Sequence, residues 1–141
     1  MAQTIRKDVQ ILKMHTVGNG TGEVKKQFAA TTTDDTATVV YSHPVAELAG
    51  VNITVQTLGL KSDAAESIRS LINSGFMRAA SGNVTEVGSD TAIASAKTST
   101  GTPTVTLIAN TTAQTVDVTV TGEAAKTFYW EVAVTYLAKQ L

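Results

Sequence analysis

Side chains that carry out acid–base or metal chemistry are few in this chain and stand far apart. The 141 residues include two histidines, His15 and His43, and no cysteine. Neither histidine has a serine or carboxylate at a spacing that indicates a catalytic relay, and without cysteine there is no thiol nucleophile or thiolate metal site. We therefore expect surface or structural roles for both histidines.

The carboxylates are also dispersed. Asp34 and Asp35 could form an oxygen site for a cation together with Glu47 or Asp63, but such a site needs several converging ligands, so we expect a solvated turn. The other acidic residues do not predict a glycosidase pair: Glu66, Glu86, Asp90 and Asp117. Asp117 alternates with valines, which favours an outward surface or edge charge. The sequence predicts neither an enzyme nor a cofactor.

Three aromatic residues are candidates for core packing or for ligand contact. Trp130 lies on the richest apolar stripe, where a buried core residue is expected; the alternative is a platform on which a sugar ring stacks. Tyr41 and Tyr129 are the candidate ligand contacts. A sugar site needs an exposed aromatic ring flanked by amide and carboxylate groups, and the sequence alone shows no cluster of that kind.

Composition indicates one domain that works in contact with neighbours. The net charge is -1, basic residues are scattered, and no apolar run reaches the ~20 residues of a membrane span, so neither nucleic acid nor membrane is an expected partner. The N-terminus lacks the features of a signal peptide, and assembly in the cytoplasm is expected. Only 16% of residues are charged, which favours an oligomer or larger assembly.

Alternating side chains predict the fold. The sequence has 24 threonines, and it alternates apolar with polar residues over many short segments, as in strands with one buried face. The clearest segments predict these inward-facing core residues: Val116, Val118, Val120, Phe128, Trp130, Val132 and Val134. Turn signals every 8–12 residues are typical of a sandwich or barrel.

The expected strands cover residues 23–31, 36–41, 51–56, 83–87, 92–96, 104–109, 115–120 and 127–138. Leu58 and Leu60 change parity relative to 51–56, which predicts a bulge near Thr57, and residues 88–90 (GSD) predict a break. Residues 64–80 fit a helix or a strand, and the all-β context favours a strand. We therefore predict an all-β, antiparallel, jelly-roll-like β-sandwich over residues 23–141.

Residues 1–22 form a separate unit in this interpretation. Residues 18–22 (GNGTG) lack the Lys-Ser/Thr pair of a phosphate loop, so we interpret them as a hinge. The preceding residues form an extended N-terminal arm, and its apolar side chains are the candidate assembly anchor: Ile5, Val9, Ile11 and Leu12.

An ordered set of motifs resembles a known family. The set comprises 51–55 (VNITV) with 60–63 (LKSD), then 65–72 (AESIRSLI) ending in 76–78 (FMR), then 83–88 (NVTEVG), 118–122 (VTVTG) and 128–134 (FYWEVAV). Over residues 36–138 the chain resembles a β-sandwich module of tailed-bacteriophage virion proteins, found in capsid-decoration, head-fibre and tail-fibre polypeptides. The residues at 68–72 are more compatible with a helix than the middle strand of that module.

The resemblance implies a structural or host-contact role and carries no catalytic residues. It implies a virion component, most simply a capsid decoration protein on the particle surface, anchored through the arm and forming a homotrimer. The implied partners are other copies of the chain and the major capsid protein or other virion proteins. The alternative is a tail- or head-fibre component that binds a host receptor or surface glycan.

Overall fold

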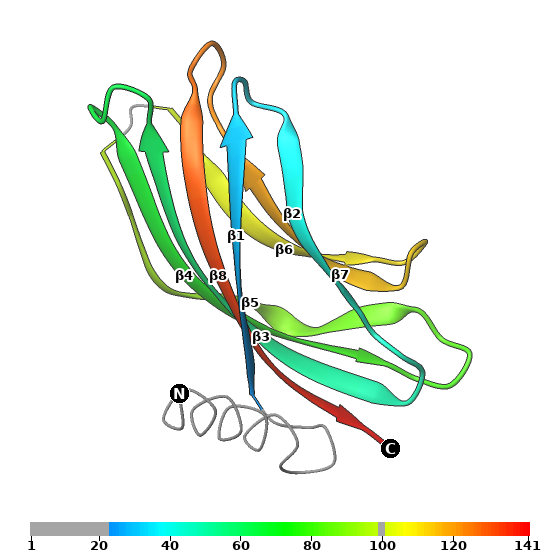
Figure 1. The fold of residues 1–141 in the computed structure, drawn as a ribbon. Coiled ribbons are helices and arrows are strands. Elements are labelled where there is room, and N and C mark those ends of the chain that lie inside the picture. Colours follow the sequence, from blue (N-terminus) through cyan, green and yellow to red (C-terminus); the bar gives the residue numbers. More distant parts are fainter. Residues whose placement is uncertain (1–22, 99–100) are drawn as a thin grey trace, which may run out of the picture.

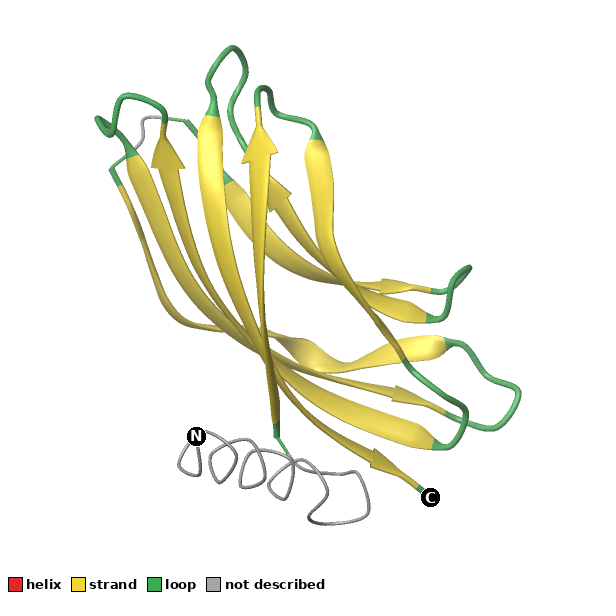
Figure 2. Cartoon of the chain, viewed as in Figure 1, coloured by secondary structure: helices red, strands yellow, loops and turns green. Residues whose placement is uncertain are grey.

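A computed structural model describes residues 23–98 and 101–141. This part of the chain folds into β-strands joined by loops and turns (Figures 1 and 2). The strands are β1 Val24–Thr32, β2 Ala37–Pro44, β3 Ala49–Lys61, β4 Ser67–Arg78, β5 Val84–Lys97, β6 Thr104–Asn110, β7 Thr115–Thr121 and β8 Phe128–Gln140. Within the described ranges there is no helix long and apolar enough to cross a membrane.

The strands form two antiparallel sheets packed face to face. One sheet has five strands in the order β1-β8-β3-β4-β5, and the other has three in the order β2-β7-β6. Strands β1, β2 and β3 alternate between the sheets, as do β7 and β8, which is the crossing pattern of a jelly roll. Strands β3, β4 and β5 instead follow one another within the larger sheet. The predicted all-β antiparallel sandwich is confirmed. The arm, the hinge and the anchor residues Ile5, Val9, Ile11 and Leu12 lie outside the described residues.

The ambiguous segment at 64–80 contains a strand, as the all-β context predicted. In β4, Ile68, Ile72 and Phe76 are buried on the inner face, with serines at the inward positions between them. Strand β4 pairs with β3 on one side and β5 on the other, so its backbone hydrogen-bonding groups are used by the sheet. Sheet pairing therefore outweighs the local helical spacing of the apolar residues.

The predicted bulge near Thr57 is wrong. Strand β3 pairs with β4 and β8 in one unbroken register, so the alternation continues with Thr57 and Gly59 inward and with Leu58 and Leu60 outward. A Cβ built on Gly59 would lie 2.6 Å from a ring carbon of Trp130. The indole therefore occupies the space that an inward side chain would need, and the leucines belong to the outer side of the sheet.

The predicted break at residues 88–90 is an irregularity inside a single strand. In the β4–β5 pairing, Asn73 opposes Thr91 and Gly75 opposes Val87, so the residues between Val87 and Thr91 bulge out of the ladder. Gly88 has a φ of 86°, a conformation that glycine adopts without strain. The expected strands at 83–87 and 92–96 therefore belong to β5.

The core lies between the two sheets. The sequence-predicted core residues Val116, Val118, Val120, Phe128, Trp130, Val132 and Val134 are all at most 1% exposed. The prediction that Asp117 is an outward surface or edge charge is wrong. Strand β7 is the middle strand of the smaller sheet, and its neighbours β2 and β6 cover Asp117 from both sides. Side chains on both faces of β7 are consequently buried.

Candidate functional site: the outer face of the five-stranded sheet

His43 belongs to an aromatic cluster that joins the two sheets. Its Nδ1 lies 3.0 Å from the Tyr41 hydroxyl, and its ring lies 4.3 Å from that of Tyr136 in β8. The Lys26 amine lies over the rings of Tyr41 and Tyr136, at 5.1 and 5.7 Å from their centroids. Burial, with a smaller effect from the charge of Lys26, lowers the pKa of His43 below its ordinary value. The cluster is structural, because its polar groups are directed at one another.

Tyr41 is therefore not a free ligand contact. Its ring stacks on Phe28 at 4.8 Å between centroids, and its hydroxyl is bonded within the cluster. Burial raises the pKa of the Tyr41 hydroxyl, and Lys26 only partly offsets this effect. The structure does not bring Tyr41 and Tyr129 together, because Tyr41 faces the cluster while Tyr129 lies on the outer side of β8.

Most carboxylates of interest have protein partners. Asp117 accepts hydrogen bonds from Asn110 Nδ2 at 3.0 Å and Thr115 Oγ1 at 2.7 Å. Desolvation opposes its ionisation, but hydrogen bonds from Asn110, Ser42 and Thr115 outweigh desolvation and lower the pKa of Asp117. Lys126 bonds Glu66 at 2.8 Å and Glu123 at 2.6 Å.

Glu86 and Asp90 were expected to be scattered, but the bulge in β5 brings them together. Ser74 Oγ donates to Glu86 Oε1 at 2.8 Å. Desolvation, together with the neighbouring Glu86 carboxylate, raises the pKa of Asp90. Both acids are exposed at the sandwich edge. Within residues 23–98 and 101–141 no group of three or more acidic or histidine side chains is placed to hold a metal ion.

Trp130 is a core residue and offers no stacking platform. Its Nε1 donates a hydrogen bond to Thr32 Oγ1 at 2.9 Å, and its ring packs against Phe128 with 5.8 Å between centroids. The indole is 1% exposed. Its size and its hydrogen bond fix the pairing of β1 with β8 at this level of the sandwich.

Exposed hydrophobic side chains gather on the outer side of the five-stranded sheet, here called the outer face. Strands β1, β8, β3, β4 and β5 contribute its side chains through their pairing register. Ten large hydrophobic residues are exposed in the described chain, and six of them lie on this face: Leu58, Leu60, Met77, Val87, Tyr129 and Leu137. Its charged strand residues are Lys25, Arg69, Glu131 and Lys139. A gathering of exposed hydrophobic side chains on one side of a sheet indicates a contact surface.

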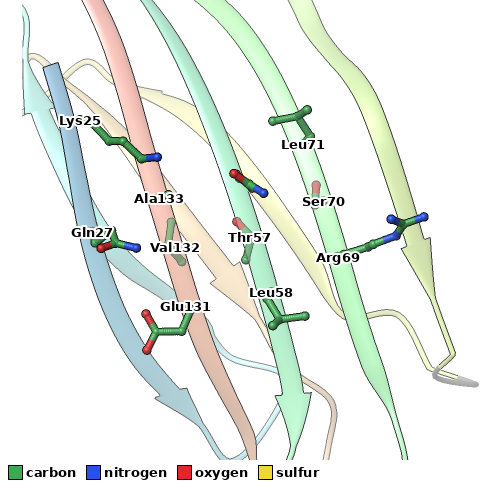
Figure 3. Close-up of a pocket in the computed structure, with 11 residues that line it drawn as sticks. Lys25, Gln27, Thr57, Leu58, Arg69, Ser70, Leu71, Glu131, Val132 and Ala133 are labelled. Carbon is green, nitrogen blue, oxygen red and sulfur yellow. The ribbon is translucent and has the colours of Figure 1, made fainter. Parts of the chain in front are cut away.

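A hollow of about 480 Å³ lies in the middle of the outer face. Ala133 and the backbone of Thr57 and Ser70 line its floor, and longer side chains, including Gln27 and Gln56, surround it (Figure 3). A neighbouring groove runs past Leu58, Leu60 and Tyr129. These shapes suit side chains of a partner surface, because small residues lie between larger ones.

Of the outer-face residues, only Tyr129 was predicted from the sequence as a contact residue. The expected bulge assigned Leu58 and Leu60 to the core side. The signal that would have corrected this was Gly59, because a glycine between two leucines marks a position where no inward side chain fits.

The fold defines a class: an antiparallel two-sheet sandwich with one apolar, charge-poor outer face. No family model matches the sequence, and no curated protein is significantly similar to it. Among solved structures, the tailspike protein of Acinetobacter baumannii phage AM24 is similar over 80% of this chain and 25% of that chain, with 9% identity and a TM-score of 0.40. This chain thus matches a quarter of the tailspike's length, and similarity at this level carries no argument about function.

Proposed function

We propose that this protein is a structural component of a tailed-bacteriophage virion and works as a repeated subunit through surface contact. The observation that carries the proposal is the outer face, where six exposed hydrophobic side chains share a surface with four charged ones. The ordered motifs at residues 51–134 support the phage assignment by resemblance. The proposal includes no catalytic activity: the acid–base groups described above are engaged in the fold or lie apart, except Glu86 and Asp90, which are neighbours, and Glu86 accepts a hydrogen bond from Ser74.

Within this class we propose a decoration protein on the capsid surface. The 141 residues show no heptad pattern of the kind that forms a coiled-coil fibre shaft. In this proposal the sandwich projects from the particle, while Ile5, Val9, Ile11 and Leu12 of the arm contact the major capsid protein or another virion protein. Homotrimer formation belongs to the proposal through the resemblance.

Gold-labelled antibody against the purified chain tests this proposal on intact particles. Label distributed over the head supports a decoration protein. Label confined to the tail or to fibres supports the alternative location and excludes decoration. Particles that carry no label, although the chain is present in the infected cell, would contradict a virion role.

A second candidate function is glycan binding, and a specific cluster favours it. Tyr129 and Glu131 line one groove of the outer face, and Glu131 lines the adjoining hollow together with Gln27 and Gln56. An exposed ring beside a carboxylate, with two amides in the adjoining hollow, is a grouping that the sequence alone did not reveal. Binding on a glycan array that is lost in Tyr129→Ser and retained in Leu137→Ser would support this function. The control is matched, since Tyr129 and Leu137 lie on the same face and are 55% and 53% exposed.

A further inference from the structure

Strand β3 is the middle strand of the five-stranded sheet, with β8 on one side and β4 on the other. Residues paired across these strands stand in rows on the outer face, because directly opposed residues of antiparallel strands share a face. Each row therefore has a β8 residue, a central β3 residue and a β4 residue. In three successive rows, the β8 residue and the β4 residue on either side of β3 are complementary to each other in charge or in size.

The first row contains opposite charges around a leucine. Leu58 pairs with Glu131 of β8 and with Arg69 of β4. Figure 3 shows Glu131 and Arg69 on opposite sides of Leu58, directed away from each other. Neither charged group takes part in an ion pair within residues 23–98 and 101–141. Both are exposed and available to a partner.

The second row contains a small and a large apolar residue. Gln56 pairs with Ala133 on the β8 side and with Leu71 on the β4 side. Ala133 lies at the floor of the 480 Å³ hollow, so the β8 side of this row is a depression, while the β4 side carries the larger, half-buried Leu71 at the edge of the hollow.

The third row repeats this arrangement with the sizes exchanged. Leu60 pairs with Tyr129 on the β8 side and with Ser67 on the β4 side. Tyr129 is 55% exposed and projects from the face, whereas Ser67, at the other end of the same row, has a short side chain.

We propose that the outer face binds a second copy of this chain through a two-fold axis that lies in the contact plane, close to the direction of β3. Such an axis exchanges the two ends of every row. Glu131 of one copy then lies opposite Arg69 of the other, and the reverse pair forms as well. Leu71 of each copy projects into the hollow above Ala133 of its partner.

A second copy fits this face better than an unrelated protein, because the complementarity is internal to the face. An isologous contact requires that one surface patch be complementary to itself. Two aligned sheets pack about 10 Å apart with their strands about 30° from each other, and a two-fold axis about 15° from β3 produces that angle. Leu58, at the centre, is removed from water in the contact.

This inference deepens the proposed function and rests on its claim that the protein works through the outer face. The contact is two-fold, so it is distinct from the trimer implied by the resemblance. The two-fold contact would form a dimer from two free chains, or it would join a chain of one trimer to a chain of another.

Paired charge reversals test the contact. Glu131→Arg places arginine opposite Arg69 of the partner, and Arg69→Glu places glutamate opposite Glu131. Each variant alone should associate about tenfold or more weakly than wild type, as expected for opposed like charges in a contact. An equimolar mixture of the two variants should restore association, because both cross-contacts again join opposite charges. Asp35→Arg, an exposed reversal in the β1–β2 turn, should leave association unchanged.

Sedimentation velocity across a concentration series measures these effects, and circular dichroism verifies that each variant is folded. Recovery of dimer in the mixture supports the two-fold contact. A wild type that stays monomeric, a strictly trimeric wild type insensitive to both reversals, or a mixture as weak as the single variants would overturn it. Particle labelling that persists while the chain is monomeric would overturn this contact and leave the proposed virion role standing.

Discussion

Gly59→Ala should destabilise the sandwich although it adds only a methyl group. The new Cβ would lie 2.6 and 2.7 Å from two ring carbons of Trp130 and 2.8 Å from Cγ2 of Ile68. Neither neighbour can move easily: the indole is fully buried and its Nε1 is held by Thr32, and Ile68 is 4% exposed. Overpacking of this kind costs about 1–3 kcal/mol of unfolding free energy.

A double-mutant cycle tests the reason for this cost. Trp130→Ala alone should cost about 3–5 kcal/mol, because it removes a large buried side chain and leaves a cavity. In that background Gly59→Ala meets only Ile68, so its additional cost should fall to less than half of its value in wild type. The two substitutions should therefore be non-additive by about 1 kcal/mol or more, as contacting residues are.

Urea unfolding followed by far-UV circular dichroism provides the assay, since a single domain of this size usually unfolds in one transition. The matched control is Gly50→Ala in the same strand, where the nearest atom to the new Cβ, the Phe76 carbonyl oxygen, lies 3.7 Å away. Gly50→Ala should change the unfolding free energy by less than about 0.5 kcal/mol. The account of β3 is refuted if Gly59→Ala is equally harmless, or if its cost is the same with and without Trp130.

Three further predictions concern the clusters and the arm. Because the pKa of His43 is lowered in the folded chain, the unfolded chain binds a proton at this residue at a higher pH than the folded chain does. The free energy of unfolding should therefore fall as the pH drops below ~6.5. His43→Phe should remove this part of the pH dependence, as measured by urea unfolding at pH 5 and 7.5. Asp117→Ala should cost about 1–3 kcal/mol, since it leaves the half-buried Asn110 amide and Thr115 hydroxyl without their acceptor; equal urea midpoints for variant and wild type would contradict this. Deletion of residues 1–17 should leave the thermal midpoint unchanged but abolish incorporation into particles, and normal incorporation would remove the anchor hypothesis.

The sequence alone was sufficient to predict the fold class and the core of the C-terminal strands. Val116, Val118 and Val120 alternate strictly with polar residues, and in β8 every second residue from Phe128 to Val134 is apolar and buried. This period is local, so it can be recognised without knowledge of which strands pair. Predicting the strand within 64–80 required one further argument: a single helix in an all-β domain would have no layer of structure to pack against.

Features that depend on distant residues were not predictable in this way. The orientation of Leu58 and Leu60 depends on the Trp130 ring over Gly59, and the burial of Asp117 depends on β2 and β6 on either side of β7. The same limit applies to the outer face. Glu131 and Arg69 lie in strands far apart in sequence, and only the register of β8, β3 and β4 places them on one row.

The most direct test of the account is incorporation of an outer-face variant into particles. Leu58→Arg places a charge at the centre of the outer face, and Val39→Arg places the same charge on the other sheet at nearly the same exposure, 52% against 53%. Particles from a phage that lacks its own copy, supplied with each tagged variant, are purified and quantified by immunoblot. The account predicts that Val39→Arg enters particles at the wild-type level and that Leu58→Arg, although folded, is strongly depleted. Equal amounts of both variants in the particles would contradict the claim that the outer face is the working surface of this protein.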